Sequence, residues 1–295
     1  EEYKEIWNKF LLKSKNGTFL FHRDYIGYHS SRFNNIGLMF KKKGSYRAMI
    51  PLNISDKVAW SHQGITYGGF LFSKDISIQE TILIFNQLNE YLRNRNIAEV
   101  YYKPLPYIYH TYSSQEDLYA LFRLNAQIIG RNISSTIVQS AQLKFTESRL
   151  SGLRKGLRLN FQICKEQNFK SFWNILEQNL QSRYGTLPVH TCDEIEQLYL
   201  CFPENIILHT VKNEDQVLCG CVIFKSTQVV HVQYISATPE GRQLGALDIL
   251  FDNLINKEYV QTPFFDLGSS NEEMGKFLNT SLIFQKKVSG GRGVC

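Results

Sequence analysis

The apolar and polar positions of this chain repeat one order of elements twice. Residues 228–268 read as a strand, a turn that contains glycine, an amphipathic helix and a second strand. Residues 62–103 follow the same order, from HQGITYGGFLF through a polar link and a helix to the strand AEVYYKP. Each unit takes about 40 residues. We therefore predict two copies of one α/β module.

The first half shows both helical and strand periodicity. Apolar residues at every third or fourth position predict a helix over 3–14. Alternation around a Gly-Ser turn predicts a β-hairpin from 36–43 and 46–54, and the meander continues to residue 72. The later elements that we predict in this module are helix 77–95, strand 98–103, helix 115–125 and a strand over 127–140.

The second half begins with a basic helix over 150–158 and continues with alternating helices and strands. The predicted elements are helices 169–183 and 193–201, strands 206–212, 217–225 and 229–236, a helix from about 244, a strand ending near 268, a helix over 268–277 and a strand over 282–287. We predict an α/β (α+β) fold of two tandem modules, 1–142 and 143–295, each a mixed, mostly antiparallel sheet flanked by helices. Because the chain lacks a starting Met and stops at GGRGVC, we expect a truncated C-terminus and a higher melting temperature for a longer chain.

Composition narrows the class of protein. With 295 residues, 43% hydrophobic and 20% charged, the chain can fill two domains of ordinary size. The acidic N-terminal helix lacks the features of a signal peptide, and no apolar run is long enough to cross a membrane, so we expect a cytoplasmic protein. The six cysteines form no CxxC pair and lack zinc-type histidine spacing, so we expect free thiols and no metal.

The net charge of +6 lies in the first module. Residues 1–140 hold 17 Lys and Arg against 11 Asp and Glu, whereas residues 141–295 hold 16 of each. This excess suits a phosphate-bearing small molecule and is too small for a dedicated DNA-binding protein. Residues 144–158 carry five basic side chains against Glu147 alone, which indicates either a solvated helix face or a phosphate site.

Several stretches together resemble one known family. They are NGTFLFHRDYIGYHSSRF, HQGITYGG, SGLRKGLR, LPVHTCDEI, HVQYISATPEG with ALDILF, and FFDLGSSNEEMGKF. The chain resembles the double-module GNAT-type acyltransferases, in the branch of the Fem-type peptidyltransferases and the bacterial BioF2-like, sugar-modifying N-acyltransferases. The resemblance implies two GNAT-like modules and attack of an amine on an activated acyl group.

The resemblance also implies a donor site at the turn after the strand 229–236. Residues 242–245 match the first four positions of the Gln/Arg-x-x-Gly-x-Gly/Ala turn that holds the pyrophosphate of coenzyme A, while Leu247 occupies the last position. The donor therefore stays open between acyl-CoA, as a co-substrate, and the aminoacyl-tRNA that Fem-type relatives use. The residues that we assign to the donor are Tyr234, Ser236, Gly241, Arg242 and Gly245.

Two side chains are candidates for catalysis. Strand alternation places His231 and Gln233 on one face, with Val232, Tyr234 and Ser236 on the other. His231 is either the base that deprotonates the amine or a hydrogen-bonded core histidine. Asp266 lies at the end of a strand. It is either an active-site carboxylate, since carboxylates at strand ends often face the active site, or the N-cap of the following helix.

Five further residues are candidates for binding the acceptor. His62, Gln63 and Tyr67 flank glycines that would let a ligand approach the backbone. Arg32 belongs to an aromatic segment that is either a packed turn or a ligand-facing loop, and Arg154 belongs to the basic helix. We expect these residues to contact an amino-sugar or nucleotide-sugar acceptor.

The function predicted from the sequence is N-acyl transfer, from acyl-CoA to the amine of an amino sugar or a related precursor of a cell-surface polysaccharide. One alternative is a Fem-type enzyme that adds an amino acid from aminoacyl-tRNA to a peptidoglycan precursor. Another alternative is a sugar-binding module without catalytic activity. A tRNA partner belongs only to the first alternative, and no long coiled-coil arm of the kind that Fem-type enzymes insert is present.

Overall fold

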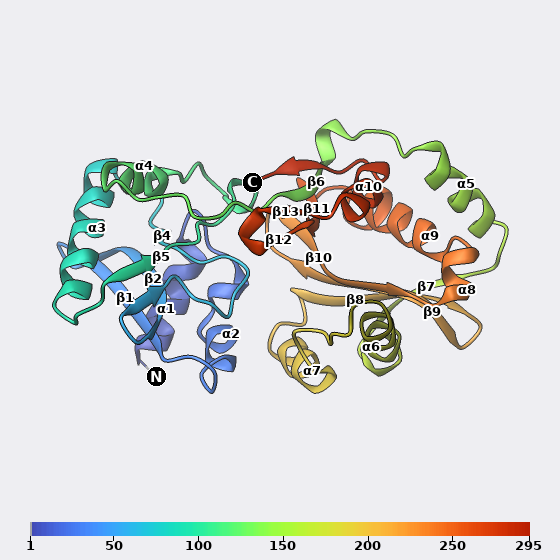
Figure 1. Ribbon diagram of the computed structural model, residues 1–295, viewed down its shortest axis with the longest axis horizontal. Helices are drawn as coiled ribbons and strands as arrows, with labels where there is room; N and C mark the ends of the chain where they lie inside the picture. The colour runs from blue at the N-terminus through green and yellow to red at the C-terminus, as the bar shows by residue number, and fades with distance from the viewer. Residues whose placement is uncertain (1) are drawn as a thin grey trace. The chain divides into compact units, whose positions relative to one another are not determined.

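The structure, a computed structural model, describes residues 2–295. The chain divides into two compact units, the first ending at Ile128 and the second running from Ile129 to Cys295 (Figure 1). Each unit holds its own mixed sheet flanked by helices, which confirms the predicted fold class. None of the helices within residues 2–295 combines the length and apolarity needed to cross a membrane.

The first unit contains a five-stranded sheet in the order β1-β2-β3-β5, with β4 paired to β2. Its helices are α1 (Glu2–Lys13), α2 (Arg23–Tyr28), α3 (Ile78–Arg93) and α4 (Glu116–Arg123). Its strands are β1 (Asn35–Lys42), β2 (Ser45–Ser55), β3 (Val58–Trp60), β4 (Leu71–Phe72) and β5 (Glu99–Tyr101).

Local sequence explains the best-defined elements of this unit. The β1–β2 hairpin turns at Lys43 and Gly44, both with positive φ, as tight hairpin turns require. Helix α3 begins at a capping box, in which Ser77 and Glu80 satisfy each other's backbone N–H groups. The predicted hairpin and helices are therefore confirmed. Residues of β2, β3 and β4 pack against α3 to form the core.

The predicted strand over 62–72 is wrong for most of its length, because only Leu71–Phe72 is extended and paired. His62 and Gly69 adopt left-handed backbone angles, with φ of 79° and 83°, which a strand cannot contain. A Cβ at Gly68 would lie 1.5 Å from the Ser61 carbonyl oxygen, so the glycine permits a close backbone contact. The segment is a compact loop that leads into β4.

The second unit contains a seven-stranded sheet in the order β14-β6-β11-β10-β9-β8-β7, and a separate β12–β13 hairpin. Its helices are α5 (Glu147–Gly156), α6 (Lys170–Tyr184), α7 (Cys192–Cys201), α8 (Pro239–Gln243), α9 (Ala246–Asn253) and α10 (Thr280–Val288). Its strands are β6 (Ser134–Val138), β7 (Gln162–Glu166), β8 (Ile206–Asn213), β9 (Gln216–Lys225), β10 (Val229–Ala237), β11 (Phe264–Ser269), β12 (Asn271–Glu272), β13 (Phe277–Leu278) and β14 (Arg292–Val294).

Strand β6 belongs to the second unit and not, as predicted, to the first module. We predicted that a strand over 127–140 completes that module, but β6 pairs with β11 and β14 in the second sheet. The division after Ile128 therefore precedes the predicted boundary between 142 and 143. Strand β6 is distant in sequence from its partners, so local periodicity could not show which sheet it joins.

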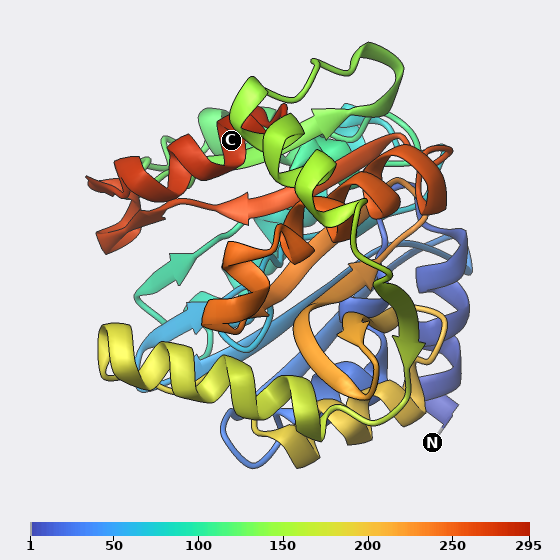
Figure 2. The same cartoon turned by 90° about the vertical axis from the view of Figure 1, so that its right-hand side faces the viewer.

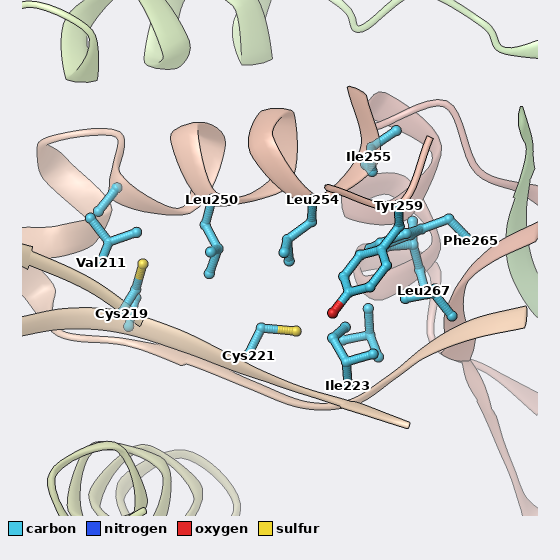
Figure 3. Close-up of a cluster of buried hydrophobic side chains, with 14 of the residues drawn as sticks. Val211, Cys219, Cys221, Ile223, Leu250, Leu254, Ile255, Tyr259, Phe265 and Leu267 are labelled. Carbon is cyan, nitrogen blue, oxygen red and sulfur yellow. The ribbon is translucent and has the colours of Figure 1, made fainter. Parts of the chain in front are cut away.

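The two faces of the second sheet are covered differently. Helices α6 and α7 lie on one face, while α9 lies on the other with α5 outside it (Figures 1 and 2). Leu250 of α9 and Leu254, which directly follows this helix, meet Cys219 and Cys221 of β9 in a buried core (Figure 3). These two thiols are therefore core residues, and burial raises the pKa of each.

Two predicted elements near the C-terminus are wrong. Residues 268–277, predicted as a helix, instead contain the end of β11 and most of the β12–β13 hairpin, in which Glu273, Met274 and Gly275 all have positive φ. Residues 282–287, predicted as a strand, belong to α10, which starts where the Asn279 side chain accepts a hydrogen bond from the Leu282 N–H at 3.0 Å.

Candidate active site

Strands β10 and β11 pair in parallel only at the start of β10. Their register runs from Val229 opposite Phe264 to His231 opposite Asp266 and then stops. Strand β10 nevertheless continues to Ala237, and β11 continues to Ser269. His231 and Asp266 are thus the last facing pair before the two strands part. A break of this kind in a sheet leaves backbone groups available to a ligand.

Asp266 is buried and receives four hydrogen bonds. Its Oδ2 lies 2.7 Å from His231 Nδ1, and its Oδ1 accepts from the Thr136 hydroxyl at 3.0 Å, the Ser134 hydroxyl and the Gly268 N–H at 3.2 Å. Burial alone would raise the pKa of Asp266, but hydrogen bonds from His231, Ser134 and Thr136 lower it overall. The carboxyl group is therefore ionised at neutral pH.

The ionised carboxylate fixes the tautomer of His231. Because a carboxylate only accepts hydrogen bonds, the neutral form of the ring carries its proton on Nδ1 and a lone pair on Nε2. No group among residues 2–295 forms a hydrogen bond with Nε2, and the side chain is 16% exposed. A Cβ at Gly268 would lie 3.5 Å from His231 Cε1, so this glycine leaves the ring edge uncovered. The arrangement suits a general base.

Lys286 of α10 joins the same group of residues. Its ammonium donates to the carbonyl oxygens of Gly268, at 2.9 Å, and Ser269, at 2.6 Å. Burial lowers the pKa of Lys286 to about 8, against the opposing influence of the Asp266 charge. Helix α10 therefore places a positive charge beside the carboxylate and ties down the end of β11.

A β-bulge changes the faces that alternation predicts for β10. The register with β9 shifts between Val232 and Tyr234. Val232 lies in the α9-side core, whereas the Tyr234 ring packs edge-on against Trp173 of α6. Since Phe265 belongs to that same core, its neighbour Asp266 and the paired His231 point to the opposite face. The prediction that Val232 and Tyr234 share a face is therefore wrong.

Tyr234 and Ser236, assigned to the donor from the sequence, make contacts within the unit. The Tyr234 hydroxyl lies 2.5 Å from His190 Nδ1, and burial raises the pKa of Tyr234 to about 12. The Ser236 hydroxyl accepts a hydrogen bond from Asn179 Nδ2 at 2.7 Å. Both side chains line the α6-facing side of β10 beyond the bulge.

The turn between β10 and α9 brings together Gly241, Arg242 and Gly245. Arg242 is exposed and donates to the Ala237 carbonyl oxygen at 2.8 Å, while Thr238 caps α8 through the Gly241 N–H. Gly245 has φ of 77° and starts α9 without a side-chain cap. The first N–H groups of α9 therefore resemble those at which helix N-termini bind anions.

The basic helix α5 packs directly on this turn. A Cβ at Gly245 would lie 2.2 Å from the Gly152 carbonyl oxygen, so the two backbones touch. Lys155 donates to the Gln243 carbonyl oxygen at 2.6 Å, and Arg149 pairs with Asp248 of α9 at 2.8 Å. Arg154, assigned to the acceptor, is exposed on α5 and pairs with Glu147.

The other residues assigned to the acceptor lie in the first unit. His62 is buried, with Nε2 3.0 Å from Asn35 Oδ1 and Nδ1 accepting from the Gly64 N–H at 3.2 Å. Tyr67 is also buried, and its hydroxyl donates to Thr18 Oγ1 at 3.1 Å. Gln63 is exposed. The Arg32 guanidinium lies over the Tyr28 ring, 5.5 Å from its centroid.

Sequence reasoning missed three residues that support the His231–Asp266 pair. Ser134 and Thr136 reach Asp266 only because β6 joins the second sheet, which no local pattern showed. Lys286 lies in a segment that we predicted as a strand, although Asn279 is a typical N-cap residue and could have indicated the start of a helix there. Among residues 2–295, no three His, Cys, Asp or Glu side chains gather in a way that could hold a metal ion.

Comparison with known proteins identifies the fold. No protein-family model and no curated protein sequence matches the chain. The structure of FemX superposes with a TM-score of 0.71 at 11% identity, over 99% of this chain and 93% of FemX. The chain has the double-module, GNAT-like fold of FemX. The resemblance inferred from the sequence is thus confirmed at the level of the fold.

Two further solved structures share this fold over almost the whole chain. L-PGS from Bacillus licheniformis has a TM-score of 0.63 at 13% identity, over 98% of this chain and 89% of L-PGS. A conserved protein of unknown function from Bacteroides thetaiotaomicron has a TM-score of 0.60 at 8% identity, over 99% of this chain and 94% of that protein. At such identities the likeness establishes the fold alone.

Proposed function

We propose that the chain is an acyltransferase that carries an acyl group from acyl-CoA to the amine of an amino sugar or a related precursor of a cell-surface polysaccharide, in the cytoplasm. The observation that carries this proposal is the His231–Asp266 pair at the point where β10 and β11 part. The FemX-like fold supports the same class of reaction.

The chemistry follows from the tautomer of His231. The amine nitrogen attacks the thioester carbonyl carbon while its proton passes to Nε2 of His231. Asp266 stabilises the resulting imidazolium through the hydrogen bond at Nδ1. As the tetrahedral intermediate collapses, the carbon–sulfur bond breaks, and the proton on Nε2 passes to the departing thiolate. The products are an amide and the free thiol of coenzyme A.

The turn from Thr238 to Gly245 is the proposed site for the pyrophosphate of the donor. Arg242 is exposed there, and the uncapped start of α9 offers backbone N–H groups. Lys155 of α5 adds a positive charge beside the turn. These groups bind the carrier, whereas His231 acts on the acceptor amine.

A second candidate function is aminoacyl transfer from aminoacyl-tRNA to a peptidoglycan precursor, as the Fem-type resemblance implies. The likeness of fold to FemX supports it. Exposed Arg154, Lys155 and Arg158 on and just after α5 also offer charges to a nucleic-acid backbone. Both candidates require the same base, and they differ in the carrier.

The test measures release of thiol from acetyl-CoA in the presence of a panel of amino sugars, in parallel with transfer from radiolabelled alanyl-tRNA and lysyl-tRNA to a peptidoglycan precursor. Thiol release that depends on both an amino sugar and His231 supports the first proposal. Transfer from tRNA alone supports the second candidate. The variant His231→Gln should lose activity, and the control His110→Gln, altered at a histidine of the first unit, should keep it. Activity that survives in His231→Gln contradicts both candidate functions.

A further inference from the structure

Helix α4 of the first unit turns its apolar side chains outward. Leu118, Tyr119 and Phe122 share one side of the helix and are 43%, 47% and 74% exposed. The opposite side packs beside α3 (Figure 1), where Ala120 is buried and Leu121 joins the core. A surface helix ordinarily presents charged and polar side chains to water. The exposed side of α4 is therefore a candidate for contact with an apolar partner.

The two carboxylates at the start of α4 are bound inside the unit. Asp117 Oδ2 accepts a hydrogen bond from the Tyr102 hydroxyl at 2.8 Å. Burial raises the pKa of Asp117 to about 6, which reflects the cost of keeping this carboxylate from water. Glu116 Oε1 accepts from the buried ammonium of Lys15 at 2.6 Å. The helix thus withdraws both negative charges from its exposed side.

The exposed side of α4 retains only a positive charge. Glu116 and Asp117 are the only acidic residues between positions 112 and 128, and Arg123, the one basic residue there, is exposed. Residues 1–128 hold 16 Lys and Arg against 11 Asp and Glu, an excess of five positive charges. We define the outward face of α4 by four residues: Leu118, Tyr119, Phe122 and Arg123.

A second exposed cation lies near the start of the helix. The Lys74 ammonium lies over the Tyr112 ring, 5.0 Å from its centroid, and both side chains are exposed. The Tyr112 backbone N–H donates to the carbonyl oxygen of Lys15, whose ammonium binds the start of α4. The neighbouring Asp75 is paired with Arg47 at 2.8 Å. Apolar, tyrosine and basic side chains therefore occur together here, as they do in protein segments that lie in a membrane interface.

We propose that the outward face of α4 docks on an anionic membrane surface. Leu118 and Phe122 enter the boundary between headgroups and acyl chains, where they leave water. The Tyr119 ring lies at the level of the headgroups, which suit its apolar body and polar hydroxyl. Arg123 pairs with lipid phosphate. A second copy of the chain fits less well, because a twofold interface would bring two positive faces together.

Sedimentation of the full chain with lipid vesicles tests the docking. The vesicles contain phosphatidylcholine and phosphatidylglycerol in equal parts, or phosphatidylcholine alone. We expect saturable binding to the mixed vesicles, much weaker binding to the neutral vesicles, and weaker binding as the salt concentration rises. Absence of binding to the mixed vesicles, or equal binding to both kinds, overturns the proposal.

Variants at exposed positions locate the binding without disturbing the core. Phe122→Ser should weaken binding to the mixed vesicles about tenfold or more, because the aromatic ring no longer leaves water. Arg123→Glu should also weaken it about tenfold or more and reduce its salt dependence. The control Leu200→Ser removes an apolar side chain of similar exposure, 77%, from α7 and should leave binding unchanged. Unchanged binding in Phe122→Ser, or an equal loss in Leu200→Ser, overturns the proposal.

Light scattering without lipid distinguishes the membrane from a second copy. A dimer that becomes monomeric in Phe122→Ser would assign the outward face of α4 to a second copy and overturn the membrane assignment. A mass that Phe122→Ser leaves unchanged agrees with membrane docking. Vesicle binding does not depend on acyl transfer, so it can succeed where thiol release fails, and thiol release without lipid should be the same in Phe122→Ser as in the parent.

Discussion

Replacing Asp266 by asparagine should invert the proton arrangement of His231. Oδ1 of Asp266 receives the hydroxyls of Ser134 and Thr136 and the Gly268 N–H, whereas Oδ2 faces only His231. An amide has one oxygen, which should occupy the position with three donors. Its NH₂ group then donates to Nδ1, and the imidazole proton moves to Nε2. The base is lost although the geometry stays intact.

The size of the effect follows from these contacts. In a well-studied hydrolase, replacing the aspartate that sets the tautomer of the catalytic histidine lowers kcat by about 10⁴-fold. We therefore expect Asp266→Asn to lower kcat by about 10³- to 10⁴-fold. Stability should fall by about 1–2 kcal/mol, since one charge-assisted hydrogen bond becomes neutral while the three donors to Oδ1 remain satisfied.

Stability should also lose part of its pH dependence. The folded pKa of Asp266 is depressed, so its contribution is complete above the unfolded value near 3.8 and disappears as pH falls through the folded pKa. The amide that replaces this carboxyl group in Asp266→Asn does not titrate. The difference in unfolding free energy between parent and variant should therefore be largest near neutral pH and shrink below pH 4.

Two assays test this reasoning. Thiol release from acetyl-CoA gives kcat, and urea unfolding at pH 7 and pH 3.5 gives stability. The control Asp215→Asn changes an exposed carboxylate in the β8–β9 turn and should leave both quantities unaltered. A variant at Asp266 that turns over at the parental rate, or whose only defect is weaker binding of acetyl-CoA, would refute the assignment.

Three further predictions concern the rest of the molecule. Gly152→Ala should lower the free energy of unfolding in urea by about 1–3 kcal/mol, because its Cβ would lie 2.0 Å from Asp248 Oδ2. The control Ser151→Ala, at an exposed position of α5, should leave the stability unchanged. Equal stabilities of the two variants would contradict close packing of α5 on α9. Burial, with the charges of neighbouring groups, lowers the pKa of His62 to about 4, so its contribution of about 3 kcal/mol is complete above pH 6.5 and lost as pH falls to 4. His62→Asn should remove that part of the pH dependence, and superimposable profiles would contradict it. Arg242→Ala should weaken acetyl-CoA binding about tenfold by calorimetry, and unchanged affinity would exclude this phosphate contact.

The sequence predicted elements whose causes are local. The β1–β2 hairpin follows from alternation around Lys43 and Gly44, and α3 follows from helical periodicity after the capping Ser77. Predictions failed where backbone angles or distant partners decide the structure. His62 and Gly69 break the expected strand because the loop folds back on Ser61, and β6 leaves the first module for a partner far along the chain.

The candidate site shows the same limit. Strand position singled out His231 and Asp266 separately, and the fold brings them to 2.7 Å. Alternation could not reveal the bulge near Val232, which carries Tyr234 to the other face. Lys286 depends on a helix from a different part of the chain. Residue types at strand ends therefore indicate chemistry, whereas the groups that tune them come from tertiary contacts.

The tautomer of the His231 ring can be measured directly by NMR of the protein with ¹⁵N-labelled histidine, over a pH series that reaches the neutral form of the ring. The resonances are assigned by comparison with His231→Gln. We predict that the neutral form of the ring carries its proton on Nδ1 and leaves Nε2 unprotonated, and that the neutral ring of Asp266→Asn shows the reverse. A parent protein that carries its proton on Nε2 would contradict the central claim that Asp266 prepares His231 to act as the base.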